Sequence, residues 1–382
     1  MQPSASYSER DTQKHLLGCW ALAVLGAMPF AIQPFFLGAL GSEFSLKPDQ
    51  LGLLAAADIL GIVIASFSGV WWAKRFAFAR LVKIAAITMT MGYLALIFAD
   101  NFLEVFWIRV VSGLLGHGIA FSLGTAFLCR TRYPDRAIAI SVITQISFSA
   151  ALLWFLPKIL AATDIPTVLF CLSVVILCVL PLILLIEPSA TPRSPSGKAH
   201  SYALLGWLLI ALVCYQLGLS AIWAFIEAIG SARLFSLEET GLMLAIILPL
   251  SMTGSLLAGT LNLRWGRTLP VVLATVAATA SLLALVQSQA PIFFALAFLM
   301  HQIAWNFGIG YVYGAVAEIS DGSGAEILAP GSQSVGTALG PILAGILAVN
   351  LSMDAVIWVS ISGMIMGSTI LFFTRAAHSP RS

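Results

Sequence analysis

Charged side chains are scarce in this chain. Only 9% of its 382 residues are Asp, Glu, Lys or Arg, whereas 59% are hydrophobic. An average soluble domain carries roughly 25% charged residues. The composition therefore excludes a soluble globular protein.

Signatures of several chemistries are also missing. The chain has no phosphate-binding glycine loop, no His/Cys cluster with metal-ligand spacing and no paired carboxylates inside its apolar stretches. We therefore expect no enzyme, no metal, no cofactor and no nucleic-acid partner. The cysteines are odd in number and lie inside or at the ends of apolar stretches, so we expect neither disulfides nor metal ligands from them. They are Cys19, Cys129, Cys171, Cys178 and Cys214.

Long apolar runs fill the sequence from Leu16 to Phe373. A bilayer core about 30 Å thick needs about 20 apolar residues per helical span, and the first run is too long for a cleavable signal peptide. Breaks at Gly, Pro, Asp and basic clusters predict twelve transmembrane helices. These lie near residues 16–40, 50–72, 80–99, 102–127, 137–160, 166–186, 202–229, 240–262, 269–288, 291–317, 330–350 and 355–374.

Basic residues select the orientation, because cationic loops stay on the cytoplasmic side of a membrane. With both termini cytoplasmic, 15 of the 19 Lys and Arg residues fall on that side. The longest polar connection, residues 187–201, is rich in Pro and Ser and predicts a cytoplasmic linker. We therefore expect an all-α integral membrane protein made of two six-helix bundles, 16–186 and 202–374, between the cytoplasmic tails 1–15 and 375–382.

The two halves resemble each other. "GALGSEFSL" after the first span corresponds to "EAIGSARLFSL" after the seventh, and a shift of 192 residues places Arg109 on His301 and Gly116 on Gly308. Duplicated halves of parallel topology are typical of secondary transporters whose binding site lies at the membrane midplane between the halves.

Short motifs carry a resemblance to the major facilitator superfamily. The family's loop motif, Gly-x-x-x-Asp-Arg-x-Gly-Arg, is similar to "GTLNLRWGR" after the eighth span and to "GVWWAKRFAFAR" after the second, although Leu263 and Ala73 replace its acidic residue. The matching residues are Gly259, Arg264, Gly266 and Arg267 in the second half, and Gly69 and Lys74 in the first. The resemblance implies a pseudo-symmetric fold that works by alternating access, with these loops contributing to gating.

Two further segments refine this resemblance. Arg109 and Gly113 fit the Arg-x-x-x-Gly pattern of the family's fourth span. The pattern Gly-x-x-x-Gly-Pro-x-x-Gly, which many family antiporters carry in the fifth span, occurs here in the eleventh, from Gly336 to Gly345. Its absence from the fifth span disfavours drug/proton antiport.

Two opposite charges lie at similar depth inside predicted spans. At 1.5 Å per residue, Arg109 is about 10 Å and Asp58 about 12 Å below the outer surface. An unpaired charge in the bilayer is costly, so we predict an ion pair between them. It either locks neighbouring helices together, or acts as a proton-sensitive switch or an anchor for a substrate anion.

Other polar groups inside the spans are candidates for a binding cavity. His301, Gln302, Trp305 and Asn306 recur at helical spacing in the tenth span; the alternative is a histidine bonded to a backbone carbonyl, with the aromatic rings facing lipid. Gln33 beside Pro34 is a candidate because broken helices are tolerated where they line cavities.

Glu227, near the outer end of the seventh span, either takes part in proton coupling or faces water.

These observations predict a monomeric secondary active transporter in the cell membrane. We expect it to be proton-coupled, with a small organic solute as substrate, and we favour uptake of an anionic or aromatic compound. Efflux of amphipathic compounds is the first alternative. A membrane sensor of the same fold that no longer transports is the second.

Overall fold

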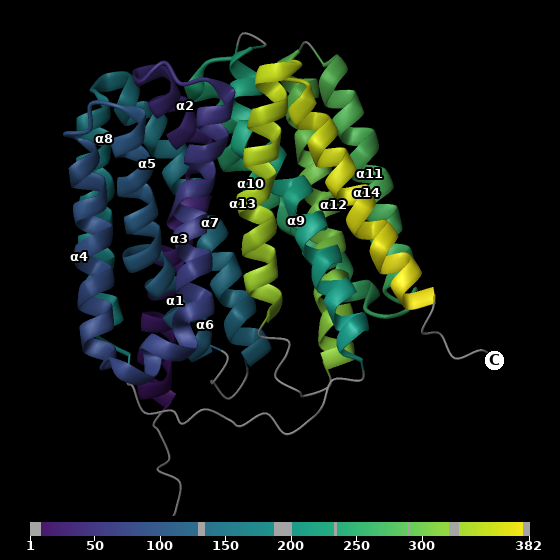
Figure 1. The fold of residues 1–382 in the computed structure, drawn as a ribbon, viewed down its shortest axis with the longest axis horizontal. Helices are drawn as coiled ribbons and strands as arrows, with labels where there is room; N and C mark the ends of the chain where they lie inside the picture. Colours follow the sequence, from purple (N-terminus) through teal and green to yellow (C-terminus); the bar gives the residue numbers. More distant parts are fainter. Residues whose placement is uncertain are drawn as a thin grey trace, which may run out of the picture.

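The computed structural model describes residues 9–128, 134–186, 201–232, 235–288, 290–320 and 328–376. Within them are twelve helices long and apolar enough to cross a membrane, which confirms the predicted number. The helices stand side by side, and α1 begins and α14 ends toward the same end of the molecule (Figure 1). We call this the proximal end and the opposite one the distal end.

The N-terminal half holds the first six spans. Its elements are α1 (Glu9–Ala31), α2 (Gln33–Glu43), α3 (Pro48–Arg75), α4 (Phe78–Leu96), α5 (Phe102–Val111), the π-helix η1 (Ser112–His117), α6 (Gly118–Leu128), α7 (Pro134–Ala162) and α8 (Ile165–Ile183). The C-terminal half contains α9 (Tyr202–Ser231), α10 (Leu237–Leu261), α11 (Thr268–Gln287), α12 (Pro291–Ser320), α13 (Leu328–Asn350) and α14 (Ala355–Ala376). Most of the predicted linker, residues 187–200, lies outside the described residues.

Two spans are interrupted. The first breaks at Ile32, between Pro29 inside α1 and Pro34 at the start of α2, because proline removes a backbone donor and clashes with the preceding turn. The fourth runs through α5, η1 and α6, and its central six residues form a π-helix. Such wide turns are rare in proteins, and many of those that do occur lie at functional sites.

Local sequence fixes several helix starts at the membrane surface. Asn101, Asp164 and Ser236 each precede a helix, and the side chain of each accepts a hydrogen bond from a backbone N–H of the first turn. Short polar side chains satisfy these otherwise unpaired donors.

At the turn between α10 and α11, Asn262 and Gly266 adopt positive φ angles of 49° and 66°.

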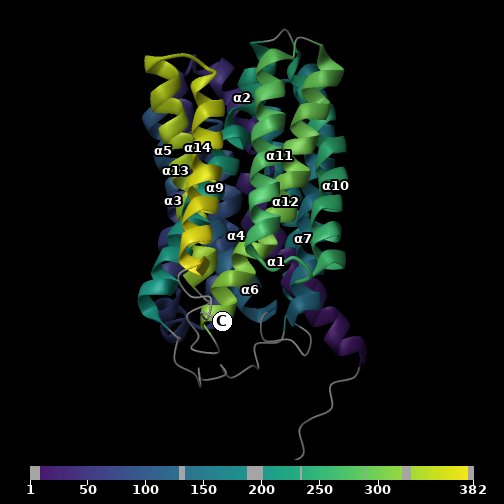
Figure 2. The same cartoon turned by 90° about the vertical axis from the view of Figure 1, so that its right-hand side faces the viewer.

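The two halves meet mainly through three helix pairs: α3 with α13, α7 with α10, and α2 with α9. Figure 2 shows the molecule from the side of the C-terminal half, with α10, α11 and α14 in front. Gly52 and Gly345 bring α3 and α13 together, since a methyl group on Gly52 would lie 3.3 Å from Gly345 Cα. Gly241 approaches Leu153 of α7 in the same way. These backbone approaches lie toward the distal end, which is therefore closed.

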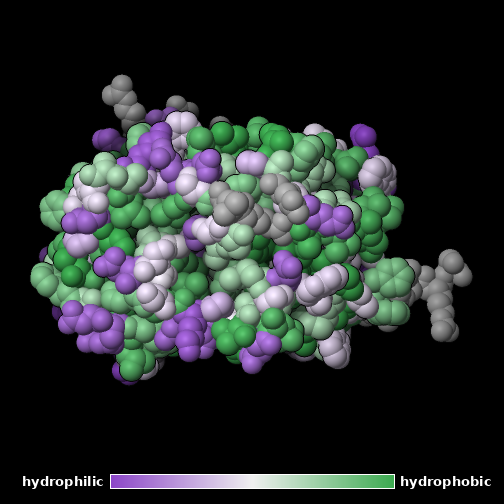
Figure 3. All heavy atoms as spheres, turned by 90° about the horizontal axis from the view of Figure 1, so that it is seen from above, coloured by the Kyte–Doolittle hydropathy of each residue, from purple (hydrophilic) through white to green (hydrophobic). Residues whose placement is uncertain are grey.

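Large hydrophobic side chains remain exposed along the helices, including Ile87, Phe155, Val276 and Phe373 at 59–66% exposure. On a spanning helix such positions face lipid. Seen from above, the distal end carries patches of hydrophilic side chains between hydrophobic ones (Figure 3).

Candidate functional site

The predicted ion pair between Asp58 and Arg109 is present. Arg109 donates from Nε to Asp58 Oδ2 at 2.6 Å, and its Nη2 lies 2.5 Å from the same oxygen. The side chains are only 2% and 6% exposed. The pair joins α5 to α3 inside the N-terminal half.

Aromatic rings enclose the guanidinium group. Its central carbon lies 4.4 Å from the ring centroid of Phe36 and 5.0 Å from that of Tyr93, distances at which a cation is attracted to the ring face. Phe36 comes from α2 and Tyr93 from α4. Four spans thus converge on Arg109 and hold it within its own half.

Glycines in and beside the π-helix bring the backbones close at this point. A methyl group on Gly113 would lie 2.7 Å from Asp58 Cα, and one on Gly61 would lie 2.6 Å from Gly113 C. Only glycine permits such an approach. The Asp58 carboxylate is therefore held against the fourth span by packing as well as by charge.

Several buried polar atoms around the pair have no hydrogen-bond partner in the described part of the chain. They include Asp58 Oδ1, Ser112 Oγ and His117 Nε2. The other ring nitrogen of His117 lies 2.7 Å from the carbonyl oxygen of Leu25. In the Asp58 carboxylate, Oδ2 makes both contacts with Arg109, whereas Oδ1 has no hydrogen-bond partner among the described residues.

The tenth-span candidates lie on different faces of α12. His301 is fully buried and its ring stacks on Phe298, so it lies away from the groove that Asn306 lines. Gln302 is also buried. Trp305 is half-buried, and its indole N–H has no partner among the described residues.

A groove of about 320 Å³ lies between α10 and α12. Ser255, Gly259, Asn306 and Gly310 are among its lining residues. Asn306 donates to Ser251 Oγ at 3.1 Å and to the Gln302 carbonyl at 3.0 Å, and no described residue donates to its Oδ1. Arg267 also lines the groove, which therefore combines uncharged hydrogen-bonding groups with one cationic side chain.

The position of Gly259 indicates where this groove opens. It follows Gly241 by eighteen residues on α10, which is about five helical turns, so both lie on one face of the helix. Gly241 contacts α7 of the N-terminal half. The groove therefore borders the space between the halves, toward the proximal end.

A hydrogen-bonded chain of uncharged side chains links three helices of the C-terminal half. Gln333 donates to Gln216 at 3.2 Å, and Gln216 donates to Thr337 at 3.0 Å. Tyr313 donates to Gln333. Gln333 and Thr337 were not predicted from the sequence, although their spacing of four residues places them on one face of the eleventh span.

Gln33 and Glu227 both lie near the contact of the first and seventh spans. Gln33 is buried and donates to the carbonyl of Ala55 at 2.9 Å, which ties α2 to α3. Glu227 is buried rather than facing water. It accepts a hydrogen bond from Ser231 at 2.6 Å and packs over Gly38 of the other half.

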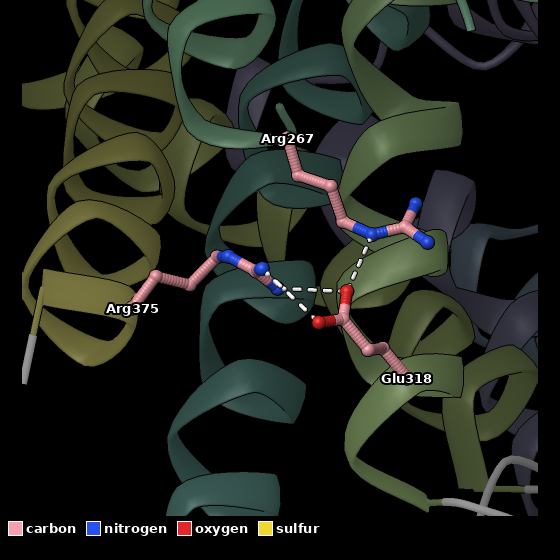
Figure 4. A network of polar contacts seen from close by, with 3 residues as sticks. All are labelled: Arg267, Glu318 and Arg375. Carbon is pink, nitrogen blue, oxygen red and sulfur yellow. Dashed lines mark hydrogen bonds and ion pairs between the residues drawn. The ribbon is translucent and has the colours of Figure 1, made fainter. Parts of the chain in front are cut away.

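An ion-pair network joins the end of the loop between α10 and α11 to α12 and α14 (Figure 4). Arg267 donates from Nε to Glu318 at 2.8 Å, and Arg375 donates to both oxygens of Glu318 at 3.1 and 3.2 Å. Leu263 occupies the acidic position of the loop motif. Glu318, near the end of α12, thus supplies the carboxylate that pairs with the motif's Arg267. Neither Glu318 nor Arg375 was predicted to take part.

The remaining loop-motif residues make few contacts. A methyl group on Gly259 or Gly266 would meet no atom within 4 Å, and one on Gly69 would only touch Trp72. Arg264 is exposed. The side chain of Lys74 lies outside the described residues, so the first-half copy of the motif stays a prediction.

Comparisons with known proteins agree with this arrangement. A family model described as "Major Facilitator Superfamily" matches residues 19–321. A bacterial homologue of the human lysosomal transporter Spinster, in an inward-facing and unoccupied conformation, superimposes with a TM-score of 0.72 at 14% identity, over 97% of this chain and 96% of that one. A comparison with curated protein sequences gave no match.

Two further structures share the fold. The xylose transporter XylE from E. coli, in a partially occluded inward-open conformation, has a TM-score of 0.74 at 14% identity and coverages of 96% and 98%. A point mutant of the nucleoside transporter NupG has a TM-score of 0.71 at 11% identity and coverages of 97% and 100%. At these identities, the similarity concerns the fold alone.

Proposed function

Because this chain belongs to the major facilitator superfamily of secondary transporters, we propose that it couples proton movement to the uptake of a small organic solute across the cell membrane by alternating access. The buried pair of Asp58 and Arg109 carries the proposal. A carboxylate inside a spanning bundle is costly unless it is paired or serves a proton pathway. Asp58 is paired through its Oδ2, which binds Arg109, and its Oδ1 has no partner in the described part of the chain, which leaves this oxygen available to accept a proton.

Protonation of Asp58 would be transmitted to the contact between the halves by α3. This helix holds Asp58 against the fourth span, and six residues earlier it holds Gly52 against α13. Neutralising one partner of a buried ion pair leaves the other charge uncompensated, which is strongly destabilising. A shift of α3 that re-solvates Arg109 would loosen the closed distal end.

The substrate that fits best is a small polar solute without a required negative charge. Arg109 is enclosed by Asp58, Phe36 and Tyr93, so an anchor for a substrate anion would first have to leave these partners. The groove beside Asn306 has about 320 Å³, near the lower end of ligand pockets. Two proteins of similar fold are named for polar solutes, xylose and a nucleoside, and XylE is described as a proton:xylose symporter.

Transport by the purified protein in liposomes tests this proposal. We expect a pH gradient, acidic outside, to drive accumulation of at least one solute from a panel of labelled sugars, nucleosides and small carboxylates. A protonophore should abolish accumulation. Asp58→Asn should retain solute exchange at equal concentrations but lose uphill accumulation.

Three results would contradict the proposal. Net extrusion of amphipathic dyes against the same gradient would favour an exporter. Accumulation that persists at wild-type level in Asp58→Asn would remove Asp58 from coupling. Solute binding without flux in either direction would favour a sensor.

A further inference from the structure

A large cavity in the described part of the chain lies next to the groove beside Asn306 and shares Arg267 with it. It has a volume of about 690 Å³ and lies at the proximal end of the C-terminal half, between α9, α11, α12 and α14. Its charged lining residues are Arg267, Glu318 and Arg375, and most of the others are apolar, including Leu208 and Leu269. A charged cluster thus faces an otherwise apolar chamber.

The cluster has an excess of positive charge. Two guanidinium groups share the single carboxylate of Glu318, which leaves a net charge of +1. Arg267 uses only its Nε for Glu318, and Figure 4 shows its two terminal nitrogens pointing away from that carboxylate, toward Gly314 of α12. Donors of this kind bind phosphate oxygens well. The net positive charge of this cluster therefore favours an anion in the cavity.

An apolar groove continues from this cavity along the outside of the bundle. A second cavity of about 300 Å³ lies between α11 and α14 and shares Val272 and Phe372 with the first. It extends along α14 to Ile365, ten residues before Arg375 and so about 15 Å along the helix. Val276 and Phe373, which line it, are 62% and 66% exposed. An anion site at a membrane surface is thus joined to a lipid-facing groove.

We propose that this composite site binds an anionic glycerophospholipid. Its phosphate would contact Arg267 and Arg375, and one acyl chain would follow the groove between α11 and α14. Charge complementarity favours a lipid with a net negative headgroup over a zwitterionic one, because a choline group would lie beside the arginines. The continuous apolar groove favours a lipid over a soluble phosphate. The lipid would connect the proximal ends of α11, α12 and α14.

Lipid retention measured by native mass spectrometry tests the site. The full-length protein, purified in detergent and stripped of lipid, is titrated with phosphatidylglycerol, phosphatidylcholine or glycerol 3-phosphate. We expect phosphatidylglycerol to bind roughly tenfold or more tightly than phosphatidylcholine, and glycerol 3-phosphate not to be retained at the same concentration. Arg375→Gln should weaken phosphatidylglycerol binding roughly tenfold, as expected for a lost charge-assisted contact. Arg264→Gln, which removes an exposed arginine of the same turn outside the cavity lining, should change it less than about twofold.

Two more variants separate a lipid site from a structural ion-pair network. Val276→Trp fills the groove without changing any charge and should weaken phosphatidylglycerol binding, whereas Val349→Trp, on an exposed surface of α13, should not. Glu318→Gln removes the competing carboxylate and should strengthen binding. Size-exclusion profiles establish that each variant is folded.

Equal retention of phosphatidylglycerol by the wild type, Arg375→Gln and Val276→Trp would overturn the proposal. Tight binding of glycerol 3-phosphate would also overturn it, in favour of a soluble-anion site.

Discussion

Replacing Asp58 by Asn tests whether the buried ion pair is as tightly integrated as the structure indicates. The substitution keeps the shape of the side chain but removes its charge, which leaves Arg109 buried and uncompensated. Arg109 makes two charge-assisted contacts with Asp58, at 2.5 and 2.6 Å, and each such bond contributes about 1.5–3 kcal/mol. The sum agrees with the roughly 3–5 kcal/mol lost when one partner of a buried pair is removed. Because Asn keeps one acceptor oxygen, we expect a loss of about 3 kcal/mol.

The assay is equilibrium unfolding of the purified protein in detergent, followed by the fluorescence of its ten tryptophans. A second variant, Asp58→Asn combined with Arg109→Met, removes both charges and places an apolar side chain between the rings of Phe36 and Tyr93. It should recover most of the lost stability, since apolar replacement of a whole buried pair is often neutral. Asp100→Asn, at an exposed carboxylate, should change stability by less than about 0.5 kcal/mol. A loss below about 1 kcal/mol for Asp58→Asn, or no recovery in the double variant, would refute the reasoning.

Three further predictions concern packing and the closed distal end. Gly113→Ala should destabilise the protein by about 1–3 kcal/mol because its methyl group meets the backbone of α3, whereas Gly310→Ala, which meets no atom within 4 Å, should be neutral or slightly stabilising in the same unfolding assay. Gly52→Leu should prevent the close approach of α3 to α13, so the distance between spin labels at the distal ends of these helices should increase; an unchanged distance would contradict this interpretation of the interface. Trp223→Phe removes a 2.9 Å hydrogen bond to the carbonyl of Phe30 in the other half and should cost about 1 kcal/mol, raising the population open at the distal end by roughly fivefold with the same labels.

The sequence predicts the spans and the ion pair because both depend on position along a helix axis. Hydropathy gives the length of each span, and the fixed rise per residue gives the depth at which Asp58 and Arg109 lie. Depth does not give the direction in which a side chain points. His301, at the repeat-related position of Arg109, was expected beside Asn306, but five residues along α12 rotate the side chain by about 140° to a different face.

The ion-pair network of Arg267, Glu318 and Arg375 was not predicted from the sequence. Leu263 occupies the position where the loop motif has an acidic residue, so the motif itself gave no partner for Arg267. Glu318, which pairs with Arg267, lies 51 residues further along the chain. The available signal was position alone: Glu318, Arg267 and Arg375 all lie at span ends on the same predicted surface of the membrane. Opposite charges at one membrane surface can form ion pairs, but which of them pair depends on which helices are neighbours.

The neutrality of the Asp58–Arg109 pair bears on how the membrane potential acts on the transport cycle. With Asp58 ionised, the pair carries no net charge, so an electric field does no work on it when the N-terminal half reorients. With Asp58 protonated, the same site carries one positive charge. Each 100 mV then contributes about 2.3 kcal/mol if that charge crosses the whole field. If Asp58 takes up the coupled proton, as proposed above, a potential that is negative inside would drive the inward step of the protonated carrier and leave the return of the unprotonated carrier unaffected.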